Sequence, residues 1–401
     1  MKIFSLIKDQ LISSRKKFIP YGKQNITRND IKSVIKVLRS DYLTQGENIG
    51  LFEKALAKRV NAKFGIAVNS ATSALHIACL SLGLKENDYL WTTPISFVAS
   101  ANCGRYCGAN VDFVDINPDT GLMSISELKQ KLEQAARGNS LPKIVIPVHL
   151  AGSSCNMREV YELSKKYNFK IIEDASHALG GKYESEPVGS CKYSDITIFS
   201  FHPVKIITTA EGGMAVTNNK SHAQKMMDLR SHCIVKDKER FIEKTPGDWR
   251  YEMQSLGFNY RMNEIQAALG LSQLKRLNYI VEKRNNLYFR YKFLLKDLPL
   301  ELIKIPNNTY SSIHLAIIRL KNKSLHREVF SKLRENGIGV QLHYQPIHLQ
   351  PYYKKQGFQK GDFPISEDFA ESCFSIPLYP ELTNFDLQRI CKALKNLLNY
   401  E

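Results

Sequence analysis

The chain has 401 residues, of which 43% are hydrophobic and 24% are charged. This length exceeds what one hydrophobic core usually spans, so two domains are expected, in a composition ordinary for a soluble globular protein. The formal net charge is +17, but the basic residues are spread along the chain without a dense run interleaved with aromatic residues. The charge pattern therefore gives a nucleic-acid-binding role only weak support.

The sequence lacks the pattern of a signal peptide and of a membrane span. Lys8 and Asp9 interrupt the apolar run at the N-terminus, and no uninterrupted apolar stretch is long enough to cross a bilayer. The eight cysteines include no CxxC pair, and no His/Cys cluster surrounds the closest two, Cys103 and Cys107. These features predict a cytoplasmic protein with free thiols, no membrane association and no bound metal.

Helices and short apolar strands alternate through the first half of the chain. Residues 27–39 carry apolar side chains at helical spacing, and Thr27 or Asn29 is suited to cap that helix. Residues 64–68 are predicted to form a strand, and residues 69–84 a helix that opens on Ser and Thr. The alternation continues with a strand at 143–148, a helix at 157–167 and a strand at 170–173. Two further strands are predicted at 196–199 and 214–217. This pattern predicts an α/β domain with a mainly parallel sheet, whose ligands bind beyond the carboxyl ends of the strands.

The pattern changes toward the C-terminus. Residues 263–295 are predicted to be continuously helical. A strand at 313–320, a helix at 327–336 and a final helix at 384–398 follow. We interpret this C-terminal third as a second, smaller α/β domain joined to the first by the long helix.

A lysine follows one of the predicted strands. Lys205 would lie at the mouth of the sheet, where a lysine can form a Schiff base with an aldehyde cofactor. Such a lysine must be partly deprotonated, and the apolar neighbours Val204, Ile206 and Ile207 would lower its pKa. Taken alone, an exposed loop lysine is the simpler interpretation, because lysines usually lie at the surface.

A carboxylate and a histidine follow another strand. Asp174 ends the run KIIED (170–174), where it can pair with a protonated pyridine nitrogen and keep the ring electron-withdrawing. His177, three residues on, could hydrogen-bond the ring of such a cofactor. The alternatives are that Asp174 caps the following turn and that His177 is an ordinary core histidine.

A segment of small residues joins the first strand to the next helix. Asn69–Ser73 would present backbone N–H groups at a helix N-terminus, which is a common anion site, and Ser200 would add a hydroxyl donor. Phe97 could stack on a pyridine ring. Helix capping and a core phenylalanine are the simpler interpretations of each residue alone. Together these residues supply a phosphate site, a stacking ring, a pyridine partner and a Schiff-base lysine.

Seven longer segments carry specific patterns, namely LTQG (43–46), NSATSALHIA (69–78), TTPISFVASAN (92–102), EDASHALG (173–180), FSFHPVKIITTAEGG (199–213), GFNYRMNEIQAALGLSQLKR (257–276) and LHYQPIHLQPYY (342–353). In this order they resemble the DegT/DnrJ/EryC1/StrS family of nucleotide-sugar aminotransferases over nearly the whole chain. The resemblance implies a fold-type I pyridoxal-phosphate transferase, with helices flanking the mainly parallel sheet of a large domain. We accordingly expect an N-terminal arm at 1–29, the large domain at 30–270 and a small C-terminal α/β domain at 271–401.

The resemblance also implies a role for each matching residue. Lys205 would hold pyridoxal 5'-phosphate as a Schiff base and then move protons, and Asp174 would pair with the pyridine nitrogen. The other implied cofactor contacts are the ring-hydroxyl partner His177, the stacking ring Phe97 and the phosphate ligands Thr72, Ser73, Ser200 and, from the neighbouring subunit, Asn259. The implied sugar-nucleotide pocket is lined by Tyr21, Asp41, Tyr42, Leu43, Thr44, His343 and Tyr344. A homodimer with shared active sites follows from the role of Asn259.

The expected substrate rests on the same resemblance. The segments at 92–102, 199–213 and 257–276 resemble the branch that makes UDP-4-amino-4,6-dideoxy-N-acetyl-β-L-altrosamine, a pseudaminic acid precursor. This implies transamination of a 4-keto-6-deoxy UDP-N-acetylhexosamine with L-glutamate as amino donor. The alternative is the UDP-4-amino-4-deoxy-L-arabinose type, which usually has Trp in place of Phe97 and Cys in place of Thr209.

Other functions stay open on the sequence alone. A sugar dehydratase of the same family would carry histidine in place of Lys205. A nicotinamide oxidoreductase would use a similar sheet, but no GxGxxG follows the first strand. A non-catalytic or nucleic-acid-binding role is motivated only by the net charge. The carboxylate of the amino donor has three candidate partners, Arg230, Arg250 and Arg261.

Overall fold

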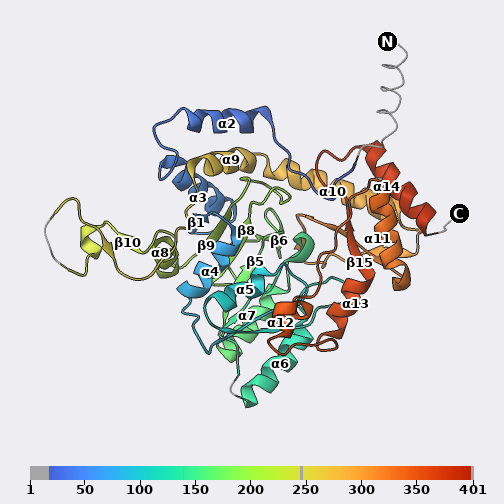
Figure 1. The fold of residues 1–401 in the computed structure, drawn as a ribbon, viewed down its shortest axis with the longest axis horizontal. Helices are drawn as coiled ribbons and strands as arrows, with labels where there is room; N and C mark the ends of the chain where they lie inside the picture. Colours follow the sequence, from blue (N-terminus) through green and yellow to red (C-terminus); the bar gives the residue numbers. More distant parts are fainter. Residues whose placement is uncertain (1–17, 139, 244–246, 399–401) are drawn as a thin grey trace, which may run out of the picture.

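The computed structural model describes residues 18–138, 140–243 and 247–398 (Figure 1). At its centre lies a seven-stranded sheet in the order β1 (Phe64–Val68), β9 (Gly213–Thr217), β8 (Ile196–Ser200), β5 (Lys170–Asp174), β4 (Ile144–Val145), β2 (Tyr89–Thr92) and β3 (Asn110–Phe113). The strands from β8 to β3 run parallel, and β9 pairs antiparallel with β8 and β1. The predicted α/β fold with a mainly parallel sheet is therefore confirmed.

Side chains alternate across the sheet, so each strand contributes to cores on both of its faces. Ile66 and Ile172 enter the core on one face. That face is covered by α4 (Ala71–Ser81), α5 (Ala99–Tyr106) and α8 (Lys220–Leu229). Ala67 and Ile171 enter the cores on the opposite face. The helices there are α3 (Glu47–Arg59), α6 (Ile125–Arg137), α7 (Met157–Tyr167) and α9 (Glu264–Leu274).

One predicted helix is wrong, because the segment 263–295 folds as two helices, α9 and α10 (Leu277–Leu294). Arg276 leaves helical geometry with φ −104° and ψ 8°, and its guanidinium donates to Asp30 Oδ2 at 2.9 Å. Asp30 lies in α2 (Arg28–Leu38), which packs along α9 at the top of Figure 1. The break accompanies a contact with a distant segment, which local hydrophobic periodicity does not report.

Two further expectations concern local geometry. The helix predicted at 27–39 is α2, and Thr27 caps it by accepting the Asp30 N–H, so that expectation is confirmed. The strand predicted at 143–148 is shorter, because β4 covers only Ile144–Val145. Pro147 carries no N–H for a ladder bond, which limits regular pairing beyond that point.

The C-terminal third folds around a second core. Its antiparallel sheet consists, in spatial order, of β12 (Leu300–Leu302), β14 (Ala316–Leu320) and β15 (Cys373–Ile376). The helices that pack on this core are α10, α11 (His326–Glu335) and α14 (Asn384–Leu397). The strand predicted at 313–320 begins only at Ala316, after Ile313 has taken a φ of 32°. The boundaries after residues 29 and 270 stay a prediction, and residues 1–17 of the expected arm lie outside the described residues.

Short elements complete the described fold. A small sheet is formed by β6 (Lys182–Tyr183), β7 (Glu186–Pro187) and β13 (Thr309–Tyr310). In an arm that projects from the body, at the left of Figure 1, β10 (Ile234–Val235) pairs with β11 (Glu252–Met253). The helices that precede β15 are α12 (Pro351–Lys354) and α13 (Pro364–Ser372). None of the helices in the described ranges is long and apolar enough to span a bilayer.

Candidate active site

A cavity of about 530 Å³ opens where several strands of the large sheet end. Asp174 and Ser200 close β5 and β8, and Thr72 lies in the first turn of α4, directly after β1. The residues predicted from the sequence that line this cavity are Tyr21, Thr72, Phe97, Asp174, His177, Ser200, Lys205, His343 and Tyr344. The structure thus brings together side chains that lie more than 300 residues apart in the sequence, at the edge where ligands of parallel sheets bind.

Lys205 lies on the cavity wall, in the loop that follows β8. Its side chain faces the cavity but is otherwise enclosed by protein, and its neighbours Ile206 and Ile207 are buried. Burial lowers the pKa of the Lys205 ammonium to about 8, although the charge of Asp174 acts in the opposite direction. A lysine with this pKa has a substantial neutral fraction near neutral pH, which nucleophilic attack on an aldehyde requires.

Asp174 is held in a fixed orientation at the end of β5. Its Oδ2 accepts the Ser100 hydroxyl at 2.6 Å, and its Oδ1 accepts the Ser176 N–H at 3.1 Å. Ser100 in turn lies 2.7 Å from the Ser96 hydroxyl. The carboxylate is 5% exposed and lines the cavity, so it can meet a cationic ring nitrogen bound there. Asp174 also makes the turn contact that was the alternative interpretation, and this contact leaves its carboxylate at the cavity wall.

His177 is part of a cluster of rings above the cavity. Its Nδ1 accepts the Ala151 N–H at 3.3 Å, and its Nε2 lies 3.1 Å from the Tyr344 hydroxyl. The His314 ring is centred 4.5 Å away and also lines the cavity. Burial, reinforced by the charge of Lys205, holds the pKa of His177 well below its usual range, so the ring is neutral. Phe97 lies beside this cluster, with its ring centre 6.3 Å from that of Tyr344.

The N-terminus of α4 faces the cavity. Ser70 caps the helix by accepting the Ser73 N–H at 3.1 Å, and Ser70 and Thr72 line the cavity. The start of β9 packs closely against this turn, because a Cβ on Gly213 would lie 2.5 Å from the Ala71 nitrogen. The first-turn amides and the positive end of the helix dipole therefore face the cavity, as an anion site requires.

Several predicted residues do not reach the cavity in the single chain. The Ser73 hydroxyl donates to Asn69 Oδ1 at 2.7 Å, and Ser73 is absent from the lining. Asn259 is exposed and pairs through its backbone with Ser231. The exposed residues between α2 and α3 that also stay outside the lining are Asp41, Tyr42, Leu43 and Thr44.

The three candidate partners of the donor carboxylate also lie outside the lining. Arg230 is engaged by Glu53 and donates to the Ala67 carbonyl at 2.7 Å. Arg250 pairs with two glutamates of the projecting arm, one of which is Glu252 at 3.2 Å. The geometry therefore does not select a partner for the donor carboxylate.

Two site residues escaped the sequence interpretation. Ser100 contacts Asp174, and His314 lines the cavity from the loop before β14. Ser96 and Ser100 lie four residues apart within one matched segment, but Ser96 precedes α5, so helical spacing gave no signal for this contact. His314 lies far along the chain, and its position depends on how the second core docks on the first.

A model of the DegT/DnrJ/EryC1/StrS aminotransferase family matches residues 24–395 of the chain. The chain belongs to this family. It is a pyridoxal-phosphate-dependent aminotransferase that acts on sugars, so the oxidoreductase and non-catalytic alternatives are set aside.

Individual relatives resemble the chain along nearly their whole length. It is 39% identical over 385 residues to the UDP-4-amino-4,6-dideoxy-N-acetyl-β-L-altrosamine transaminase of Campylobacter jejuni, covering 95% of this chain and 97% of the relative. It is 33% identical over 394 residues to the spore coat polysaccharide biosynthesis protein SpsC of Bacillus subtilis, covering 97% and 99% respectively. Among solved structures, PseC of Helicobacter pylori, an aminotransferase involved in the biosynthesis of pseudoaminic acid, gives a TM-score of 0.87 at 33% identity, covering 96% of this chain and 100% of PseC.

The cavity of this family member fits pyridoxal 5'-phosphate on three observed features. Lys205 offers an amine of lowered pKa, Asp174 offers a fixed buried carboxylate, and the start of α4 offers amides for a phosphate. When bound, this cofactor supplies an electron-withdrawing ring that stabilises the negative charge which develops while an amino group moves. Lys205 is placed to hold or deliver a proton at its Nζ, because its lowered pKa lets it do either near neutral pH.

Proposed function

We propose that this aminotransferase moves the amino group of L-glutamate to C4 of UDP-2-acetamido-2,6-dideoxy-β-L-arabino-hexos-4-ulose. The product is UDP-4-amino-4,6-dideoxy-N-acetyl-β-L-altrosamine, a precursor of pseudaminic acid. The observation that carries this proposal is the 39% identity, across 95% of the chain, with the Campylobacter jejuni transaminase of that name. The similarity to PseC at a TM-score of 0.87 supports the same substrate class.

The proposal assigns the chemical steps to two residues. Lys205 holds the cofactor and moves the proton, and Asp174 pairs with the pyridine nitrogen. The lowered pKa of Lys205 and the two hydrogen bonds that orient Asp174 support these roles. Borohydride reduction of the holoenzyme followed by peptide mass spectrometry tests the first assignment. A cofactor label on Lys205 is expected, and a label on another lysine would contradict it.

The lining of the cavity supports the remaining proposed cofactor contacts. Phe97 stacks on the ring, and His177 sits near the ring hydroxyl. Thr72 and Ser200 bind the phosphate together with Ser73, whose hydroxyl must turn away from Asn69 to reach it. The capped N-terminus of α4 supports the phosphate site, because its amides face the cavity.

The proposed substrate pocket is the part of the cavity that Tyr21, His343 and Tyr344 line. The Tyr21 and His343 rings are centred 5.3 Å apart, so they form one continuous wall. Phe97 is smaller than the Trp typical of the pentose-specific branch, which leaves room for the N-acetyl and C6-methyl groups of the proposed hexose. A UDP-4-amino-4-deoxy-L-arabinose type of activity is the competing outcome.

A homodimer completes the proposed site. Asn259 and residues 41–44 are exposed in the single chain, which is the position expected of groups that serve a neighbouring subunit. The projecting arm also exposes large apolar side chains, namely Ile242, Trp249, Tyr251, Met253 and Leu256. Exposed apolar groups gathered on one projection are typical of a surface that a protein partner covers. We propose that a second copy covers this arm and that the partner's Asn259 reaches the phosphate.

The location proposed for the reaction is the cytosol. All eight cysteines are free thiols, and six of them are buried, which suits a reducing compartment.

Product analysis tests the proposed function directly. The purified holoenzyme is incubated with L-glutamate and a panel of 4-keto UDP-sugars, and mass spectrometry identifies each aminated product. We expect amination of the N-acetylated 6-deoxy hexosulose. If that compound stays unchanged while the 4-keto pentose is aminated, the substrate proposal is wrong but the aminotransferase class stands.

A further inference from the structure

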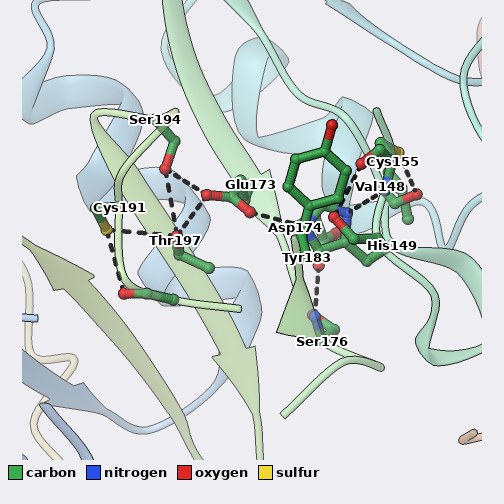
Figure 2. A network of polar contacts seen from close by, with 12 residues as sticks. Val148, His149, Cys155, Glu173, Asp174, Ser176, Tyr183, Cys191, Ser194 and Thr197 are labelled. Carbon is green, nitrogen blue, oxygen red and sulfur yellow. Dashed lines mark hydrogen bonds and ion pairs between the residues drawn. The ribbon is translucent and has the colours of Figure 1, made fainter. Parts of the chain in front are cut away.

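His149 and Glu173 form a buried pair on the side of β5 opposite to the Asp174 side chain (Figure 2). His149 Nε2 lies 2.8 Å from Glu173 Oε2, and both residues are at least 94% buried. Glu173 Oε1 accepts hydroxyl hydrogen bonds from Ser194 at 2.5 Å and from Thr197 at 3.0 Å. Glu173 immediately precedes Asp174, and the side chains of neighbouring strand residues point to opposite faces. The network around Glu173 therefore anchors the end of β5 on the face opposite to the one from which Asp174 reaches the cavity.

The tautomer of His149 follows from its second ring contact. The Cys155 N–H donates to His149 Nδ1 at 3.2 Å, so Nδ1 is an acceptor and carries no proton. The proton on Nε2 is therefore donated to Glu173. Against the effect of burial, this contact raises the pKa of His149, while the Cys155 N–H opposes a second ring proton at Nδ1. The His149 backbone N–H also donates to the Asp174 carbonyl at 3.0 Å. His149 thus ties the segment 149–155 to β5 through its ring and its backbone.

This segment makes a tight turn that reaches the active site. Ala151, in the short 3-10 helix Leu150–Gly152, has a φ of 58°, an uncommon value for a residue with a Cβ. The turn cannot relax outward, because the Ala151 carbonyl accepts the His314 N–H at 2.7 Å. In this conformation the Ala151 N–H donates to His177 Nδ1 at 3.3 Å. A shift of His149 would therefore move the turn and, with it, the Ala151 N–H that contacts the His177 ring.

The hydrogen bond from Ala151 has a consequence for the proton of His177. Because Nδ1 accepts, the neutral ring must carry its proton on Nε2, which lies 3.1 Å from the Tyr344 hydroxyl oxygen. His177 is then the donor in that contact, and the proton of Tyr344 is left to point elsewhere. Burial raises the pKa of the Tyr344 hydroxyl, so this proton stays in place. Tyr344 lines the cavity, so its hydroxyl proton is free to meet a group bound there.

We propose that His149 and Glu173 are positioning residues that hold the turn at Ala151, which keeps the His177 proton on Nε2 and makes Tyr344 a hydrogen-bond donor to the group bound in the cavity. This inference rests on the proposed function, because it takes His177 and Tyr344 as part of the site. Neither His149 nor Glu173 touches the cavity, so they act only through the turn. The proposal thus explains why the carboxylate of Glu173 is buried although it does not reach the cavity.

Substituting Glu173 by Gln disturbs the contact between His149 and Glu173, and so the turn at Ala151, with little change in the shape of the side chain. One oxygen of the new amide can still accept the hydroxyls of Ser194 and Thr197, but its NH2 group would face the His149 Nε2–H. Relief requires the His149 proton to move to Nδ1, where it would meet the Cys155 N–H. The one amide orientation that avoids both clashes places its NH2 group on the Ser194 and Thr197 hydroxyls, which then have to accept instead of donate. Every arrangement therefore loses hydrogen bonds to the carboxylate, and the network that holds the turn is weakened.

A second buried pair provides a matched control. His348 Nε2 lies 3.0 Å from Glu367 Oε1, and both residues are as enclosed as the first pair. Glu367 lies in α13 and does not line the cavity. Glu367→Gln therefore makes the same chemical change in a buried His–Glu pair without the link through Ala151.

The first measurement needs no substrate. Ring-nitrogen chemical shifts of 15N-histidine-labelled holoenzyme report the tautomer of His177, assigned by the signal that disappears in His177→Gln. The proton is expected on Nε2 in the native enzyme and in Glu367→Gln, and on both nitrogens in exchange in Glu173→Gln. A native proton on Nδ1, or an unchanged tautomer in a folded Glu173→Gln protein, would overturn the proposal.

The second measurement is the single-turnover reaction of the bound cofactor with L-glutamate, followed by absorbance. Its rate is expected to fall about tenfold in Glu173→Gln, with the apparent affinity for glutamate changed less than about twofold and no fall in Glu367→Gln. If Glu173→Gln does not fold, Ser194→Ala takes its place, because it removes one donor to Glu173 and keeps the pair with His149. A smaller fall in rate is expected for this variant. Equal falls in the Glu173 and Glu367 variants would mean a general loss of stability and would overturn the proposal. A native enzyme that fails to react with glutamate would instead contradict the proposed function.

Discussion

The Ser100 hydroxyl donates a hydrogen bond of 2.6 Å to Asp174 Oδ2, and it joins the first helix after β2 to the end of β5. The Ser176 N–H holds the other oxygen at 3.1 Å. A carboxylate with both oxygens held cannot rotate freely, so its direction into the cavity is set before any ligand binds. Pre-orientation of this kind lowers the cost of arranging charge during the reaction.

Ser100→Ala is predicted to reduce kcat about tenfold, because a hydrogen bond to a charged group contributes about 1.5–3 kcal/mol and only part of it is felt in the transition state. The cofactor should still bind, since Lys205 and the α4 site are untouched. Ser81→Ala is the control, because this buried serine donates to the Ala78 carbonyl in α4. Steady-state kinetics compare the two variants, and equal effects on kcat would contradict the role of Ser100.

Lys205→Met is predicted to stabilise the cofactor-free protein at neutral pH. Burial lowers the pKa of Lys205 to about 8, from an ordinary value near 10.5, so between these values the unfolded chain binds more protons than the folded one. The stability of the native apoprotein should therefore rise with pH through this window, and the cost of burying the cation is full below about 8. Methionine carries no charge and removes that cost.

Differential scanning calorimetry of both apoproteins from pH 6.5 to about 9.5 measures this effect. The Tm of Lys205→Met should exceed that of the native apoprotein at the lower end, and the difference should shrink as the pH rises. A difference that is constant across the range, or a lower Tm for the variant at neutral pH, would show that Lys205 is not desolvated.

Asn259→Ala is predicted to weaken cofactor binding while leaving the subunits associated. If the partner's Asn259 completes the phosphate site, added cofactor should raise the Tm less in the variant than in the native dimer, in line with RT ln(1 + [L]/Kd). Asn286→Ala, at an exposed position of α10, is the matched control. Ultracentrifugation reports the assembly state, and a fully active native monomer would rule out the shared site.

The fold was largely accessible from the sequence because its signals are local. The strands ending at Val68, Asp174 and Ser200 are short apolar runs, and each is followed by the small or polar residues that line the cavity. Lys205 and Asp174 could be placed because parallel strands end at the same edge of a sheet. Where the chain obeys local rules, position in the sequence translates into position in space.

The parts that were missed depend on contacts between distant segments. Arg276 breaks the long helix where it reaches Asp30, and Ser100 meets Asp174 across a separation of 74 residues. The turn at Ala151 is shaped by the loop before β14, so its contact with His177 has no local signature. Asn259 and residues 41–44 do not meet the cavity of the same chain. The role predicted for Asn259 depends on a second copy, and the role predicted for residues 41–44 stays a prediction.

A comparison of kcat/KM among three 4-keto UDP-sugars tests the central claim most directly. The native enzyme is assayed with L-glutamate and UDP-2-acetamido-2,6-dideoxy-β-L-arabino-hexos-4-ulose, its D-xylo epimer, and the 4-keto pentose. We predict the highest kcat/KM for the first sugar, by about tenfold or more over the pentose, because its N-acetyl and C6-methyl groups add contacts in the pocket beside Phe97. A higher kcat/KM for the pentose or for the epimer would contradict the account.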